Sequence, residues 1–100
     1  MTKDAASHPM QIIVKVFGGL RESFPGGGQQ LLLPSASTLA ALLCELQIAF
    51  PDGSAKLTAG LDAGYLNVLI NGRNIHFLQG NQTPLHDGDT VAFLPPVGGG

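Results

Sequence analysis

The first strongly patterned segment of the chain is residues 11–17, with the sequence QIIVKVF. It is rich in β-branched residues and is followed by two glycines, which predicts a β-strand. Side chains alternate between the two faces of a strand. One face carries Ile12, Val14 and Val16, and the other carries Ile13, Lys15 and Phe17. Because Lys15 favours water, we expect the wholly apolar set in the core, which leaves Phe17 as an apolar residue on the solvated face.

The next segments predict a hairpin and then a helix. Residues 24–28 (FPGGG) are typical of a turn, and residues 29–33 form a short strand that ends at Pro34. Apolar side chains then recur at helical spacing over residues 39–50, and residues 51–53 (PDG) end the helix. The apolar helical positions are Leu39, Leu42, Leu43, Leu46 and Phe50. Hydroxyl groups that could cap its N-terminus are those of Ser35, Ser37 and Thr38.

The second half of the chain predicts three more strands. Residues 54–64 are rich in Gly, Ala and Ser and predict at most a short helical turn. Strands are expected over residues 65–71, 75–78 and 90–95, with turns at residues 71–72 (NG) and 87–89 (DGD). A hairpin, a helix crossing one face, and a last strand beside the first make an α+β, ubiquitin-like β-grasp fold. We expect a mixed sheet of four to five strands with one main helix packed across it.

Composition supports one globular domain and excludes several classes of partner. The chain is 44% hydrophobic and 12% charged, unlike a disordered protein. We expect a disordered extension over residues 1–9, the domain over residues 10–95 and a flexible tail over residues 96–100. Five Lys and Arg residues and a net charge of −2 argue against nucleic acid as a partner. No stretch of about 18 apolar residues predicts a membrane span. We expect a cytoplasmic protein, and the single cysteine agrees with a reducing compartment.

Conventional catalytic and metal-binding sets are not apparent. His8, His76 and His86 are scattered without the spacing of zinc ligands, and we expect them at the surface. Cys44 lies among leucines of the predicted helix, which favours an inert core residue. The glycine pairs lack the Lys-Ser/Thr of a phosphate loop, and the DGD turn lacks the other ligands of a calcium loop. We therefore expect no metal site and no bound cofactor.

The unusual feature is the end of the chain, where Gly98, Gly99 and Gly100 follow a strand and two prolines. Glycines make a slender tail that can adopt whatever backbone angles a narrow channel demands. Six extended residues at about 3.3 Å each reach roughly 20 Å. A terminal carboxylate is an anion at neutral pH and can attack the α-phosphate of ATP to give an acyl-adenylate. The sequence thus favours Gly100 as the reactive group.

Three segments make the resemblance to a family specific: FGGLRESF, NVLINGRNIHF and DGDTVAFLPPVGGG. They resemble the MoaD/ThiS-like sulfur carriers, which include the small subunit of molybdopterin synthase. The resemblance implies that a ubiquitin-activating-type adenylyltransferase uses ATP to adenylate Gly100. A sulfurtransferase system then converts it to a thiocarboxylate, with Gly99 as the second glycine of the pair. Gly98 stands where relatives often have Ala or Thr.

In the molybdenum branch of that family, the carrier docks on the large subunit of molybdopterin synthase and supplies sulfur for molybdopterin, the organic part of the molybdenum cofactor. The resemblance therefore implies a docking surface near the tail. If Val91 and Phe93 point inward, other residues of the last strand point outward beside the first strand. The expected partner-binding residues are Ile13, Phe17, Arg73, Ala92, Leu94 and Pro96. Arg21 and Arg73 could add charge pairs at the rim of this surface, but neither is specific, and solvated arginines are the more common case.

Three alternatives remain open from the sequence. The same carrier chemistry serves cysteine, thiamine and tungsten-cofactor pathways. NGRNIHFLQG is also similar to archaeal small modifiers, whose terminal glycine is joined to lysines of other proteins, here through Gly100. The third alternative is a ubiquitin-like interaction module that binds through its sheet and does not react.

Overall fold

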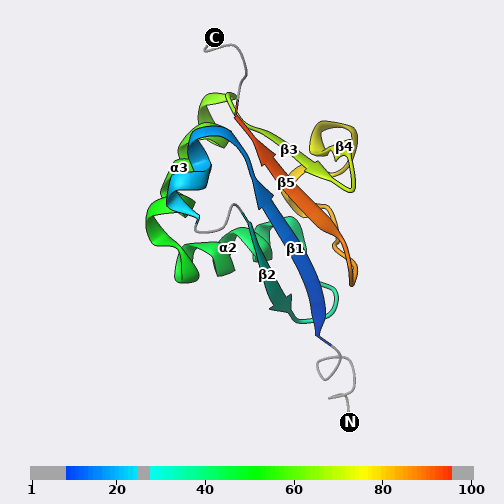
Figure 1. The fold of residues 1–100 in the computed structure, drawn as a ribbon. Coiled ribbons are helices and arrows are strands. Elements are labelled where there is room, and N and C mark those ends of the chain that lie inside the picture. Colours follow the sequence, from blue (N-terminus) through cyan, green and yellow to red (C-terminus); the bar gives the residue numbers. More distant parts are fainter. Residues whose placement is uncertain (1–8, 25–27, 96–100) are drawn as a thin grey trace.

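The computed structural model of the chain describes residues 9–24 and 28–95 (Figure 1). Residues 1–8 of the predicted extension and residues 96–100 of the predicted tail lie outside the described residues. Pro96, Gly98, Gly99 and Gly100 are therefore sites of sequence-based predictions only.

A five-stranded mixed sheet forms the body of the domain. Its strands are β1 (Met10–Val16), β2 (Gly28–Leu33), β3 (Asn67–Ile70), β4 (Arg73–Asn74) and β5 (Thr90–Leu94). They are ordered β2-β1-β5-β3-β4, with β1 and β5 parallel at the centre and the other neighbours antiparallel. The helices lie on the far side of the sheet in Figure 1. This arrangement confirms the predicted α+β, β-grasp fold.

Two α-helices, rather than one main helix, make the crossover between β2 and β3. Helix α2 (Leu39–Ala49) is the predicted one, and α3 (Pro51–Ala63) follows it almost immediately. Pro51 ends α2 but occupies the first turn of α3, where its missing N–H has no helical partner to lose. The buried side of α3 consists of Gly53, Ser54 and Leu57. Two small residues give a weak apolar pattern, so the sequence did not reveal this helix.

The short segments of the fold are 3₁₀-helical turns. These are η1 (Gly18–Ser23), η3 (Ile75–Phe77) and η4 (Gly80–Gln82). The predicted strand over residues 75–78 is wrong, because β4 ends at Asn74 and η3 begins at the next residue, Ile75. The side chain of Asn74 accepts a hydrogen bond from the His76 amide at 2.8 Å, which turns the chain out of the sheet.

The N-terminus of α2 is held by a neighbouring loop rather than by a hydroxyl cap. Thr38 is the N-cap residue but makes no side-chain capping bond. The hydroxyl of Ser37 donates to the Pro34 carbonyl at 2.7 Å instead. The Leu39 amide donates to the Thr83 carbonyl at 3.0 Å. The residue after η4 thus supplies an acceptor for one of the first-turn N–H groups of α2, which have no acceptor within the helix. The prediction that the Thr38 hydroxyl caps this helix is therefore wrong.

The core lies between the sheet and the two helices, and its composition confirms the predicted strand faces. The predicted inner residues Ile12, Val14, Val16, Val91 and Phe93 are all buried. Leu39, Leu42 and Leu46 of α2 and Leu57 of α3 cover them from the helical side.

Cys44, in contrast, is exposed, so the prediction that it is a core residue is wrong. It is two positions from both Leu42 and Leu46, which puts it on roughly the opposite side of α2 from the buried leucines. His76 and His86 are at the surface as predicted, and His8 lies outside the described residues.

None of the helices in the described ranges has both the length and the apolar character needed to cross a bilayer.

Candidate functional site

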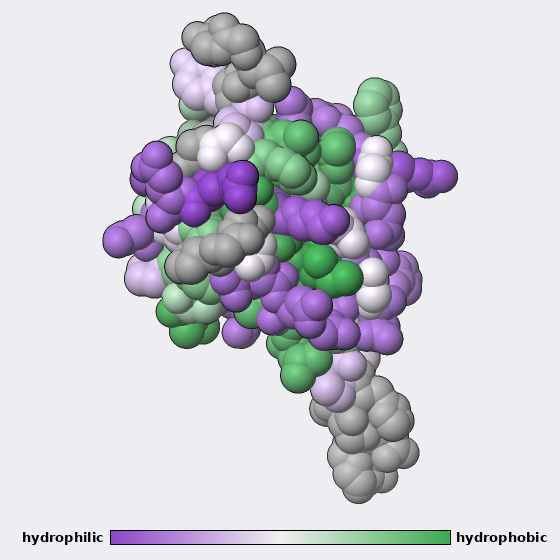
Figure 2. Space-filling model, viewed as in Figure 1, coloured by the Kyte–Doolittle hydropathy of each residue, from purple (hydrophilic) through white to green (hydrophobic). Residues whose placement is uncertain are grey.

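The outer face of the sheet is the surface that the helices leave uncovered. The register of β1 and β5 pairs Ile13 with Thr90 and Lys15 with Ala92. On the other side of β5, Leu69 pairs with Ala92 and Asn67 pairs with Leu94. Paired residues point to the same side of a sheet, so these side chains form one continuous face. Apolar side chains gather over β1 and β5 on the face turned to the viewer in Figure 2, interrupted by hydrophilic ones.

The structure brings most of the predicted partner-binding residues together on this face. Ile13, Ala92 and Leu94 are half-buried there, and Phe17 follows β1 with 43% of its surface exposed. The amide of Phe17 donates to the Phe93 carbonyl at 3.3 Å, which ties it to the end of β5. We call the set Ile13, Phe17, Leu69, Ala92 and Leu94 the outer patch.

Arg73 does not belong to the outer patch. It pairs with Ile70 across β3 and β4, and Ile70 belongs to the buried side of the sheet. Arg73 therefore lies on the same side of the sheet as Ile70, which is the side opposite to the outer patch, and it belongs to the edge strand β4. Leu69, by contrast, was missed from the sequence. Its position between the inward Val68 and Ile70 is the alternation signal that could have identified it.

Pro95, at the end of the described domain, approaches Gly18 closely. Gly18 has φ +64°, and a Cβ there would lie 2.8 Å from Cγ of Pro95. Only glycine tolerates both the left-handed backbone and this approach. The first glycine of the FGG segment thus lets η1 turn away from β1 while Pro95, the last described residue, packs against it.

The DGD turn organises the opposite end of β5. The Asp87 carboxylate accepts from the Gln11 amide at 2.7 Å, and the Gly88 amide donates to the Gln11 carbonyl at 2.8 Å. Asp89 accepts from the His86 amide and from the Asn71 side-chain amide, both at 2.8 Å. These bonds attach the start of β5 to β1 and to the turn after β3, which fixes the register of the outer patch.

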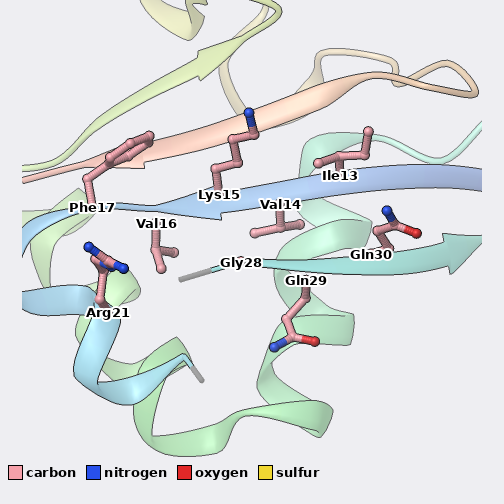
Figure 3. Close-up of a pocket in the computed structure, with 9 residues that line it drawn as sticks. All are labelled: Ile13, Val14, Lys15, Val16, Phe17, Arg21, Gly28, Gln29 and Gln30. Atoms are coloured by element: carbon pink, nitrogen blue, oxygen red, sulfur yellow. The ribbon is translucent and has the colours of Figure 1, made fainter. Parts of the chain in front are cut away.

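A surface hollow of about 660 Å³ borders the outer patch along β1 and β2 (Figure 3). Its described lining is Ile13, Val14, Lys15, Val16, Phe17, Arg21, Gly28, Gln29 and Gln30. Figure 3 shows Lys15 and Phe17 on the same side of β1, with Arg21 beside Phe17 from η1. The hollow therefore combines one exposed aromatic ring with two cationic side chains.

Groups used in conventional catalysis do not converge in residues 9–24 and 28–95. No three His, Cys, Asp or Glu side chains there lie close enough to hold a metal ion. His86 Nδ1 lies 3.7 Å from Asp89 Oδ2. Cys44 is an exposed free cysteine on α2, more than 40 positions earlier in the sequence than this pair. What this part of the molecule offers is a partly apolar sheet face and a cationic hollow close to Pro95.

Comparison with known proteins agrees with this arrangement. The fold is that of the ubiquitin-like β-grasp proteins: it matches the solution structure of small archaeal modifier protein 1 (SAMP1) from Methanosarcina acetivorans with a TM-score of 0.75 and 32% identity. That match covers 93% of this chain and 99% of the modifier. The family model described as the ThiS family matches residues 14–100, and the chain belongs to this family of ubiquitin-like sulfur carriers.

Two further relatives have more specific names. The sulfur carrier protein CysO of Mycobacterium tuberculosis is 32% identical over 78 residues, which are 74% of this chain and 84% of CysO. In a protein–protein complex of subunits 1 and 2 of the molybdopterin-converting factor from Helicobacter pylori, the matching chain has a TM-score of 0.60 and 28% identity. The match covers 91% of this chain and 100% of the Helicobacter pylori chain.

Proposed function

We propose that the chain carries sulfur as a thiocarboxylate on Gly100. A carboxylate oxygen of Gly100 attacks the α-phosphate of ATP in an activating adenylyltransferase, and pyrophosphate leaves. The persulfide of a sulfurtransferase system then attacks the acyl carbon and displaces AMP, and a second thiol reduces the resulting acyl disulfide to leave the thiocarboxylate on Gly100. The observation that carries this proposal is the family match, which extends through the last residues of the sequence, Gly98 to Gly100.

Within this function the domain and the tail would have different roles. The outer patch offers the partner an apolar surface, and Pro95, which contacts Gly18, lies beside that patch. A partner bound to the patch would therefore be close to the residues that lead to Gly100. The outer patch would serve first the adenylyltransferase and later the enzyme that takes the sulfur. Because activation consumes ATP, we expect these steps in the cytoplasm.

For the sulfur acceptor, we propose the precursor of molybdopterin, with this chain as the small subunit of a molybdopterin synthase. The likeness to a subunit that forms a complex with subunit 2 of the Helicobacter pylori converting factor supports this choice. A large-subunit partner would bind the outer patch and take the tail into its own active site.

Cysteine synthesis is the second candidate, and the similarity to CysO favours it. Conjugation of Gly100 to lysines of other proteins is the third, favoured by the likeness to SAMP1. All three begin with the same adenylate, and they differ in the step that follows. In conjugation a lysine amine attacks the activated glycine, whereas in the two sulfur-transfer pathways the thiocarboxylate sulfur is itself the nucleophile and the acceptor is the electrophile.

Activation tests the shared step. The purified chain, mixed with an adenylyltransferase from its own organism, should support exchange of pyrophosphate into ATP. A variant that lacks Gly99 and Gly100 should fold normally but give no exchange, because its carboxylate no longer reaches the nucleotide. Exchange at the full rate with the shortened chain would contradict the proposal.

The acceptor is tested by offering the thiolated chain to each candidate partner. Formation of molybdopterin with a large synthase subunit and the pterin precursor supports the first pathway. Formation of cysteine with a cysteine synthase supports the second. An isopeptide bond between Gly100 and a target lysine, found by peptide mass spectrometry, supports conjugation.

A further inference from the structure

Two cations beside the root of the tail have no described acidic partner. Lys15 and Arg21 both line the hollow of about 660 Å³, and both are exposed. Within residues 9–24 and 28–95 the one ion pair joins His86 and Asp89. The described lining contains no Asp or Glu, although Glu22 follows Arg21 on η1 without lining the hollow. The hollow is thus a cationic site on a chain of net charge −2.

An aromatic ring beside these cations gives the site a mixed character. Phe17 is 43% exposed, with Lys15 beside it along β1 and Arg21 beside it on η1 (Figure 3). The hydrophobic stems of long cationic side chains cover apolar surface while their charged ends remain in water. A complementary surface would therefore present carboxylates around an apolar side chain that covers the ring.

The position of the hollow relates it to the tail. The Phe17 amide is bonded to the Phe93 carbonyl at 3.3 Å, and the next residue, Gly18, contacts Pro95. An enzyme that accepts Gly100 must approach the root of the tail and so must pass beside Phe17. Arg73 lies on the edge strand β4 and on the other face of the sheet, so an enzyme that approaches along this path would not contact it.

We propose that this hollow receives an acidic segment of the adenylyltransferase that activates the tail, with carboxylates meeting Lys15 and Arg21 and an apolar side chain on Phe17. This inference rests on the proposed function and names the chemistry of its first partner. Elsewhere the acidic surface of the carrier would repel such a segment, so the two cations select the orientation in which the tail faces the enzyme.

A protein surface fits the site better than a free anion does. Lys15 and Arg21 come from different elements, β1 and η1, and each lies beside the ring of Phe17 (Figure 3). The rest of the described lining is Gly28 and residues that are apolar or amide-bearing. A phosphate group is held by backbone amides or positive groups that converge on one point. Two cations from separate elements beside an exposed aromatic ring suit a protein surface, which can offer carboxylates and an apolar side chain together.

Charge reversal measures the effect on activation. Lys15→Glu and Arg21→Glu should each raise the KM for the carrier in pyrophosphate exchange by about tenfold and leave kcat within about twofold, because rim charges mainly control encounter. The neutral variants Lys15→Gln and Arg21→Gln should give smaller increases and reduce the dependence of KM on salt. Arg73→Glu is the matched control, with an unchanged KM. Melting temperatures of all five variants show whether each is folded.

Each outcome decides. If KM rises equally in Arg73→Glu, the effect is one of net charge and the inference is wrong. If the charge reversals in the hollow leave KM unchanged while the native chain is activated, the inference fails and the proposed function stands. No exchange with the native chain overturns both.

Two rival occupants are tested directly. Titration of the isotopically labelled chain with inorganic phosphate or ATP should leave the amide signals of Lys15 and Arg21 in place, and specific shifts there would overturn the inference in favour of a free anion. Sedimentation should show a monomer for the native chain. A dimer that Arg21→Glu dissociates would assign the hollow to a second copy.

Discussion

Gly18 shows how one residue constrains the packing of Pro95, the last described residue. Its backbone is left-handed at φ +64°, and its missing Cβ makes room for the ring of Pro95. The contact is the point where η1, the end of β1 and the end of β5 meet. A side chain at this position would clash with Pro95 and would have to displace it. Pro95 is the residue that leads to the segment ending at Gly100, the proposed reactive residue.

Gly18→Ala should therefore lower the free energy of unfolding by about 2–3 kcal/mol, from backbone strain and the clash together. Gly80→Ala is the control, because Gly80 has φ +57° with nothing within 4 Å of an added Cβ. It should cost about 1 kcal/mol, from the backbone alone. Chemical denaturation measures both, and equal losses would show that the Pro95 contact adds nothing.

Asp89 is the second residue on which the surface depends. Its carboxylate accepts from the His86 amide and from Asn71 Nδ2, and Asn71 Oδ1 in turn accepts from the Thr90 amide at 3.0 Å. The side chain of Asp89 is only 13% exposed, so its carboxylate meets little water, although both donor residues lie at the surface.

Asp89→Ala should lower the free energy of unfolding by about 2–3 kcal/mol, since it leaves two donors without their acceptor. Asp62→Ala, at an exposed position of α3, should change stability little. Amide exchange should also speed up at the start of β5 in Asp89→Ala. A variant as stable as the native chain would show that this turn does not hold the register.

At the scale of elements, β5 separates stability from recognition within a few residues. Phe93 is fully buried at 0% exposure, while the neighbouring Leu94 is half-buried and points to the outer patch. The alternation of a strand thus lets one residue serve the core and the next serve a partner.

Leu94→Glu should reduce the efficiency of activation about tenfold or more, because a charge would be buried against an apolar partner surface. Its melting temperature should stay close to that of the native chain. Phe93→Ala should behave in the opposite way and lose about 3–5 kcal/mol of stability through a cavity. A large drop in the melting temperature of Leu94→Glu would identify Leu94 as a core residue instead.

The elements also show what could be predicted from sequence and why. The faces of β1 were predictable because Lys15 breaks an otherwise apolar strand, and those of β5 because Val91 and Phe93 alternate with smaller or outward residues. Helix α3 was not predictable, since its buried side holds Gly53 against the ring of Phe24, a tertiary contact without a hydrophobic signal. Cys44 was misassigned because leucines flank it on both sides in a helix that buries only one of its faces.

The candidate site followed the same rule. Residues whose direction depends on strand alternation, such as Ile13 and Ala92, were assigned correctly to one surface. Arg73 follows a tight turn, where the face of the sheet depends on the register with Ile70, and no local pattern reports that register. The hollow needed the fold as well, because it joins β1 to η1 and β2.

At the scale of the whole molecule, the proposed function gives the domain and the tail different tasks. The described residues hold the outer patch and the cationic hollow along the sheet, and Phe17, Leu94 and Pro95 lie at the end that leads to the tail. The proposed reactive carboxylate lies outside them, at a reach of roughly 20 Å if the segment is extended. The domain would determine which enzyme binds, and the tail would supply the chemistry.

The most direct test of this account is mass spectrometry of the chain after incubation with its adenylyltransferase, ATP and a sulfur donor. Exchange of one oxygen for sulfur adds about 16 Da, and the account predicts that gain on the peptide that ends at Gly100. The modified peptide should react with a thiol-directed alkylating reagent, which distinguishes it from an oxidised methionine. An unmodified Gly100 under conditions in which sulfur reaches the acceptor through this chain would contradict the account.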